Sequence, residues 1–63
     1  MNDGIIVTVC YGQRREWDTR QEAIDYFVEG MWSCDPMSHE YLRYATIVEQ
    51  LKGGTFYATD ENC

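Results

Sequence analysis

The chain has 63 residues, of which 44% are hydrophobic and 14% aromatic, and it carries eleven acidic against five basic side chains. A chain of this size forms one domain at most, so we expect a single domain over residues 1–63. The net charge of −6 argues against a protein that binds nucleic-acid phosphates, because such proteins gather Lys and Arg on one face. The apolar content argues against disorder, apart from fraying at residues 1–4 and 60–63.

The first predicted element is a strand over residues 5–11, which reads IIVTVCY. Its β-branched content favours a strand, and because both of its faces are largely apolar we expect it at the centre of a sheet. Gly12-Gln13 then reads as a two-residue hairpin turn, with Gly12 supplying the positive φ that a type II′ turn needs at its first position. Residues 14–17 form the return strand.

The length of this turn decides which face of the hairpin packs on the helices, because a slip of one residue reverses every side chain. A two-residue loop places Trp17 with the even-numbered residues of the first strand. A three-residue loop or a bulge places it with the odd-numbered ones. Both arrangements are open from the sequence, and we expect the second. The expected inward face consists of Ile5, Val7, Val9 and Trp17.

A helix is predicted to begin after Thr19 and to run to about Cys34. Thr19 can cap its N-terminus, and Glu22 can reach back to the Thr19 N–H, which gives a capping box. Apolar residues recur every three and four positions and form one face of this helix. They are Ala23, Ile24, Phe27, Gly30, Met31 and Cys34.

A second helix is predicted to begin near Pro36 with Asp35 as its cap, or alternatively after Ser38 as the cap. It runs to about Lys52, where a Gly-Gly pair ends it. Its apolar face comprises Tyr41, Tyr44, Ala45, Val48 and Leu51, with Ile47 on the flank. The residues expected to point away are Arg43, Thr46 and Gln50. A last strand covers residues 55–59.

These elements predict an α+β fold of order ββααβ. A three-stranded sheet carries an αα-hairpin packed on one face. We expect the third strand to lie beside the first and parallel to it, with pairing to the second strand as the alternative. With only two layers, the outer face of the sheet meets either solvent or a partner.

Catalytic chemistry is not evident in the sequence, and we expect a non-enzyme without cofactor or metal. His39 is the single histidine and has no nucleophile and orienting partner at suitable spacing. The three cysteines, Cys10, Cys34 and Cys63, include no C-x-x-C pair of the kind that binds zinc. The one basic pair, Arg14-Arg15, is typical of an edge strand protected against aggregation.

The odd number of cysteines and the absence of a signal-peptide pattern indicate a reducing compartment, and we expect the protein in the cytoplasm. No apolar run approaches the length of a membrane span, so no membrane partner is expected.

The candidate binding surface is the outer side of the first helix. Acidic residues recur there at three- and four-residue spacing, beside a tryptophan, a residue type enriched in interface hot spots. The predicted partner-binding residues are Asp18, Glu22, Asp25, Val28, Glu29 and Trp32. Two alternatives stay open: Trp32 could cover the end of the core at the Asp35-Pro36 turn, and the acidic residues could serve solubility alone.

One further pattern is the order, along most of the chain, of Tyr11-Gly12, Arg14-Arg15, Trp17, Thr19, Glu22-Ala23, Phe27, Gly30-Met31, Tyr41, Arg43-Tyr44, Leu51 and Gly54. This order resembles that of small acidic accessory proteins of Gram-positive mobile genetic elements. Some small acidic proteins from that setting are anti-CRISPR proteins, which bind a Cas effector. The resemblance implies an accessory protein of a mobile element. Together with the small size, the net charge of −6 and the acidic residues beside Trp32, it leads us to expect a binding protein that inhibits a basic, nucleic-acid-handling partner, most sharply an anti-CRISPR protein that blocks a Cas effector, without binding nucleic acid itself. The alternative is a regulatory or assembly module that acts as a homodimer through the outer sheet face.

Overall fold

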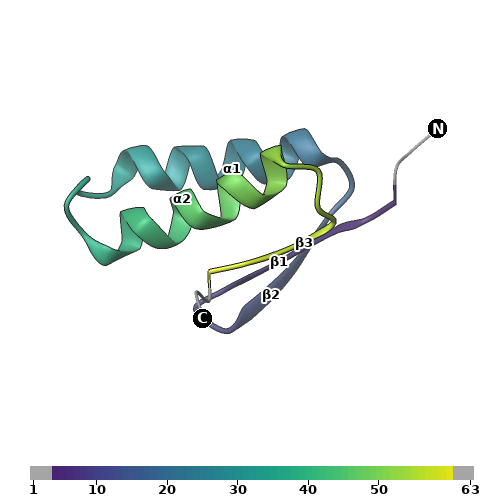
Figure 1. The fold of residues 1–63 in the computed structure, drawn as a ribbon, viewed down its shortest axis with the longest axis horizontal. Coiled ribbons are helices and arrows are strands. Elements are labelled where there is room, and N and C mark those ends of the chain that lie inside the picture. Colours follow the sequence, from purple (N-terminus) through teal and green to yellow (C-terminus); the bar gives the residue numbers. More distant parts are fainter. Residues whose placement is uncertain (1–3, 61–63) are drawn as a thin grey trace.

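The computed structural model describes residues 4–60 and confirms the α+β fold (Figure 1). Strands β1 (Ile6–Cys10) and β2 (Gln13–Trp17) form a hairpin, helices α1 (Arg20–Ser33) and α2 (His39–Lys52) follow, and β3 (Tyr57–Thr59) ends the fold. The strand order is β2-β1-β3, with β1 antiparallel to β2 and parallel to β3. The first strand is therefore central and pairs in parallel with the third, as predicted.

The expected inward face of the hairpin is wrong. In the observed register Ile6 pairs with Trp17 and Cys10 pairs with Gln13, so the even-numbered residues of β1 face the helices. Ile6 and Thr8 are buried, and the Trp17 Nε1–H donates a hydrogen bond of 3.0 Å to the Thr8 hydroxyl. The outer face carries instead the side chains predicted to point inward from the first strand. These are Ile5, Val7 and Val9.

The length of the turn explains the error, because the expected inward face required a three-residue loop or a bulge and the turn has two residues. They are Tyr11 and Gly12, one position before the predicted Gly12-Gln13, and both have positive φ, 54° and 78°. Two consecutive residues with positive φ are the mark of a type I′ turn, whose twist matches that of the strands. A tyrosine rarely takes this conformation, so the sequence gives little reason to expect it there.

Both helices begin at a side-chain cap. The Thr19 hydroxyl accepts a hydrogen bond from the Glu22 N–H at 3.2 Å, as predicted for the first half of a capping box. Ser38, not Asp35, caps α2 by accepting from the Tyr41 N–H at 3.2 Å. Pro36 therefore lies in the connecting turn. Asp35 stabilises that turn by accepting from the Met37 N–H at 2.9 Å.

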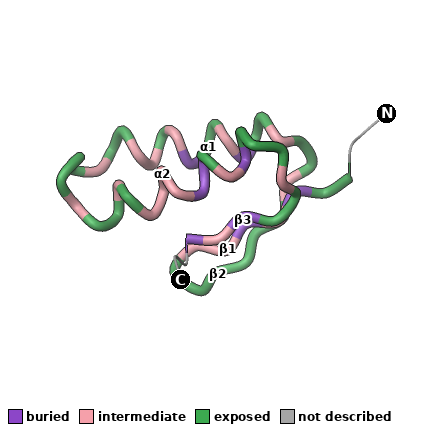
Figure 2. Tube along the Cα trace, viewed as in Figure 1, coloured by how far each residue is buried: buried purple, intermediate pink, exposed green. Residues whose placement is uncertain are grey.

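The core lies where the right-hand half of the helical hairpin in Figure 2 covers the sheet. Its largest side chain, Phe27, is 1% exposed and packs edge-on against Trp17 and obliquely against Tyr44. The fully buried apolar residues are Ile6, Ala23, Phe27, Ile47, Val48, Leu51 and Ala58. The left-hand end of the hairpin extends past the sheet and is mostly exposed (Figures 1 and 2).

Arg20 joins the start of α1 to the end of α2. Its guanidinium donates hydrogen bonds to the carbonyl oxygens of Leu51 at 2.9 Å, Thr55 at 2.6 Å and Gly54 at 3.2 Å. The last carbonyls of a helix have no partner within the helix and carry partial negative charge. A single cation therefore holds the C-terminal end of α2 and the loop that leads into β3.

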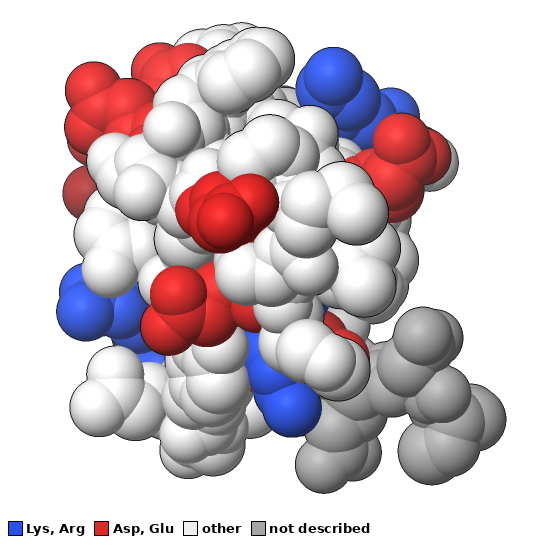
Figure 3. Space-filling view, turned by 90° about the vertical axis from the view of Figure 1, so that its left-hand side faces the viewer, with Lys and Arg blue, Asp and Glu red and all other residues white. Residues whose placement is uncertain are grey.

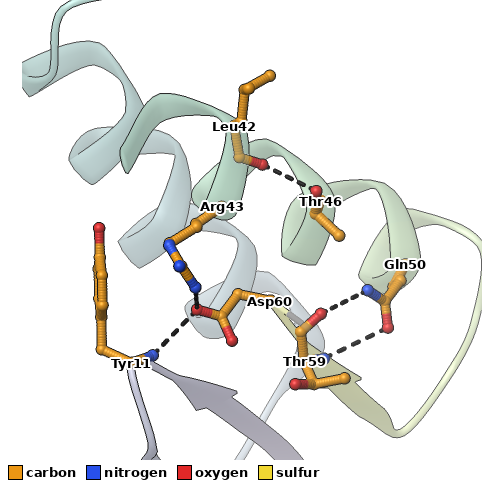
Figure 4. Close-up of polar contacts among 7 residues, drawn as sticks. All are labelled: Tyr11, Leu42, Arg43, Thr46, Gln50, Thr59 and Asp60. Carbon is orange, nitrogen blue, oxygen red and sulfur yellow. Dashed lines mark hydrogen bonds and ion pairs between the residues drawn. The ribbon is translucent and has the colours of Figure 1, made fainter. Parts of the chain in front are cut away.

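Asp60 corrects the prediction that the chain frays from residue 60, while residues 1–3 and 61–63 lie outside the described residues. Its side chain is 3% exposed, forms a 2.7 Å ion pair with Arg43 and accepts from the Tyr11 N–H at 3.1 Å (Figure 4). The pKa of Asp60 is lowered, because these two partners outweigh the effect of burial, which raises it.

Two residues expected to point away from the fold instead bind the end of the described chain, Gln50 at Thr59 of β3 and Arg43 at Asp60 directly after it. The Gln50 amide donates to the Thr59 carbonyl at 2.7 Å and accepts from the Thr59 N–H at 3.3 Å (Figure 4). β3 lies beneath this side of α2 at the edge of the sheet. Its backbone there hydrogen-bonds to the Gln50 side chain, as it would to a neighbouring strand. Thr46 donates to the Leu42 carbonyl of its own helix.

Candidate partner-binding face

The four predicted acidic residues, Asp18, Glu22, Asp25 and Glu29, are all exposed on α1 or directly before it. Residues three and four positions apart on a helix have Cβ atoms about 5–6 Å apart, so the carboxylates form a row along one side. Viewed onto the end of the helical hairpin, acidic side chains gather at the upper left, over α1 (Figure 3).

This acidic row has no cationic partner among residues 4–60. The two ion pairs within that range are Arg14 with Glu16 and Arg43 with Asp60. Arg20, the one basic residue of α1, is turned to the end of α2. Asp25 accepts a hydrogen bond of 2.8 Å from Gln21, which leaves its charge unneutralised. The negative charge of α1 is therefore available to a binding partner.

Trp32 is 74% exposed at the last turn of α1. This exposure contradicts the alternative in which its ring covers the end of the core. Val28, the other predicted apolar member of the face, is half-buried and packs against the core, so it supports the helix more than it offers contact area. The predicted face thus reduces to an acidic row that ends in one exposed indole.

Sequence reasoning missed two apolar residues beyond Trp32, Met37 and Leu42, which are 90% and 61% exposed. Met37 follows Pro36 in the connecting turn, and Leu42 directly follows Tyr41 of the predicted apolar face of α2 without belonging to that face. The position of Leu42 outside the apolar face was the sequence signal for its exposure. The far end of the hairpin therefore exposes more apolar surface than its helical pattern suggested.

A second feature missed from the sequence is a pocket of about 220 Å³ between the β1–β2 turn and the helices. Its wall includes Cys10, Tyr11, Arg15, Tyr26, Phe27 and Tyr44. Burial raises the pKa of the Cys10 thiol and of the Tyr44 phenol, so both are neutral at pH 7. The pocket combines side chains from the β1–β2 turn, both strands of that hairpin and both helices, and no sequence motif marks it.

The described part of the chain offers little else for chemistry. No group of three or more His, Cys, Asp or Glu side chains within residues 4–60 could hold a metal ion. His39 is the first residue of α2 and is exposed. Burial, together with a Glu40 carboxylate oxygen 3.7 Å away, raises the pKa of the Cys34 thiol. Neither described helix combines the length and the apolar character that a membrane span requires.

Comparison with known proteins gives no further guide to this face. No family model matches the chain, and neither a curated protein nor a solved structure does.

Proposed function

We propose that the chain is a non-enzymatic binding protein that docks the acidic face of α1, with Trp32, on a basic surface of a nucleic-acid-handling protein and thereby inhibits it. The observation that carries the proposal is the row of four exposed, unpaired carboxylates ending in a 74% exposed tryptophan. An exposed tryptophan supplies the desolvated anchor that interfaces favour, and charges around it direct association with a basic partner.

The sharpest form of the proposal is an anti-CRISPR protein that binds a Cas effector. Its support is the resemblance to mobile-element proteins together with the acidic row, because spaced carboxylates on a rigid helix can occupy a channel that normally receives phosphates. The protein itself would not bind nucleic acid, since its net charge is −6.

The direct test is a target-cleavage assay with a purified Cas effector from a Gram-positive bacterium, with and without the protein. We expect inhibition that weakens as salt rises, because screening shortens the reach of the carboxylates. Capture of partners on tagged protein from a Gram-positive lysate, with reductant at low and high salt, extends the test to other nucleic-acid-handling proteins.

A matched pair of charge reversals tests whether the face itself matters. Glu29→Lys changes the proposed face, whereas Glu49→Lys makes the same change at an exposed position of α2. We expect Glu29→Lys and Trp32→Ala to abolish capture and Glu49→Lys to preserve it. Equal losses for the two reversals would mean that only overall charge is being sensed, and the proposed site would be wrong.

The second candidate function is a homodimeric module of a mobile element that associates through the outer sheet face. The observation that favours it is the exposure of Ile5 and Tyr57, 52% and 56%, beside half-buried Val7 and Val9. Ile6 is buried under the helices and is not part of this outer face. Light scattering in reductant that gives a dimer, lost in Tyr57→Arg, would favour this candidate over inhibition.

A further inference from the structure

The pocket beside the β1–β2 turn lies at the end of the sheet opposite the Arg20 contacts. In Figure 1 the strands diverge from the helical hairpin toward this turn, and the wall residues come from β1, the turn, β2 and both helices. A volume of about 220 Å³ is below the ~300–1,000 Å³ of sites for drug-sized ligands. It suits a ligand with one ring or two fused rings.

Four of the seven residues that line the pocket are aromatic. Tyr26 packs edge-on against Phe27, with ring centroids 5.0 Å apart, and Phe27 lies 5.9 Å from Tyr44. Their faces and edges favour a flat apolar group, because aromatic pairs gain from stacked or edge-to-face contact. The aromatic part of the lining therefore favours a planar ring.

An aromatic-lined pocket in an acidic protein would ordinarily suggest a cationic ligand, but the guanidinium groups reverse that expectation. Arg15 lies over the ring of Tyr26 at 4.9 Å and Arg43 lies over the ring of Tyr11 at 4.7 Å. Two of the four aromatic rings in the wall therefore already carry a cation of the protein. A second cation would meet repulsion there.

Arg15 supplies the charge that a ligand can use. The register pairs Arg15 with Thr8, so its side chain lies on the helix-facing side of β2, while Arg14 lies on the outer side in an ion pair with Glu16. Within residues 4–60 no carboxylate lies within ion-pair distance of Arg15, whereas Arg43 is neutralised by Asp60. A guanidinium binds a carboxylate through two parallel N–H donors.

The rim of the pocket is held rigidly. Tyr11 has a φ of 54°, an uncommon conformation for a residue with a side chain. Its N–H donates to Asp60, and its ring stands beside the Arg43 guanidinium (Figure 4). These contacts fix the strained turn from the opposite end of the chain. Strained residues held in place in this way concentrate at ligand sites.

We infer that this pocket binds a small planar aromatic carboxylate, with the ring among Tyr11, Tyr26 and Tyr44 and the carboxylate on Arg15. The inference is independent of the acidic face, since the pocket shares no residue with it. The competing explanation is that Arg15 only protects an edge strand, because inward-pointing charges serve that purpose.

The test is a titration of the full chain with indole-3-acetate, followed by ¹H–¹⁵N correlation spectra at constant ionic strength. Indole-3-acetamide and tryptamine replace the carboxylate by a neutral amide and by a cation on the same ring. We expect saturable shifts at the amides of Cys10, Tyr11 and Gln13 with the carboxylate. The amide should bind at least about tenfold more weakly, and tryptamine more weakly still.

Two variants assign the charge. Arg15→Gln is expected to weaken binding of indole-3-acetate by about tenfold or more, and Arg14→Gln, on the outer side of the same strand, by less than twofold. The dispersion of each variant's spectrum shows that it is folded. Tryptamine binding as tightly as indole-3-acetate would overturn the inference. Equal effects of the two variants, or chemical shifts that never saturate, would also overturn it. Arg15 would then serve only to protect the edge strand.

Discussion

Carboxylates occur in two regions of this molecule under opposite conditions. At the corner between the β1–β2 turn and α2, Asp60 is buried, paired with Arg43 and bound to the backbone of Tyr11. Along α1, Glu22 and Glu29 are exposed and have no cation near them within residues 4–60. The same chemical group therefore maintains the fold in one place and remains exposed to solvent in the other.

The largest expected effect comes from neutralising the buried carboxylate. Asp60→Asn removes the charge that neutralises Arg43 and weakens the acceptor for the Tyr11 N–H, which holds a residue of positive φ. We expect a loss of about 2 kcal/mol in the free energy of unfolding, below the full cost of a buried ion pair because Arg43 is partly exposed. Urea unfolding followed by circular dichroism measures it, with Asp25→Asn as the exposed control.

The destabilisation caused by the same variant should depend on pH. The folded-state pKa of Asp60 lies below its ordinary value of 3.8, so its ionised form stabilises the protein above that pH. This contribution is lost as the pH falls through the folded-state pKa. The difference in stability between the natural chain and Asp60→Asn should therefore be constant near pH 7 and narrow below about pH 3.8. A difference that stays constant through the acid range would contradict the assignment.

The opposite end of the molecule offers a smaller effect. Arg20→Ala removes three hydrogen bonds to the carbonyls of Leu51, Gly54 and Thr55. We expect a loss of about 1–2 kcal/mol, because these bonds involve a charged donor but are partly open to water. Lys52→Ala is the control, since it removes a cation from the same helix end at an exposed position. Thermal unfolding should separate the two variants, and equal destabilisation would mean that Arg20 acts only through its charge.

The smallest effect is expected on the exposed face of α1. Trp32→Ala should change the free energy of unfolding by less than about 0.5 kcal/mol, because the side chain is already 74% exposed. Glu29→Gln should stabilise the fold by about 0.2–0.5 kcal/mol by easing repulsion from Asp25 one turn away. Both are measured by urea unfolding. A large loss in either would show that this face serves the core, and that it is not kept for binding.

Local signals in the sequence predicted the elements well. Thr19, followed three residues later by Glu22, marked the start of α1, and the Gly-Gly pair after Lys52 marked the end of α2. These features depend on neighbours within one helical turn. The exposure of the acidic row followed from the same helical period, which is why the candidate face could be named before the fold was known.

The errors arose where distant residues decide a local conformation. The β1–β2 turn uses Tyr11 at positive φ, and its support is Asp60, 49 positions away in the chain. No window around the turn contains that information. The pocket escaped prediction for the same reason, because Arg15, Tyr26 and Tyr44 meet only after the hairpin register is set.

The parallel pairing of β1 with β3 has a consequence for how the protein is made. The central strand is synthesised before both helices, whereas the neighbour that completes it, Tyr57–Thr59, follows them in the chain. The αα-hairpin depends on local contacts and can form before β3 is available, whereas the sheet closes only once Tyr57–Thr59 has been made. A nascent chain interrupted before β3 would keep one side of β1 unpaired and leave the core short of Ala58, which makes such fragments natural substrates for cellular proteases.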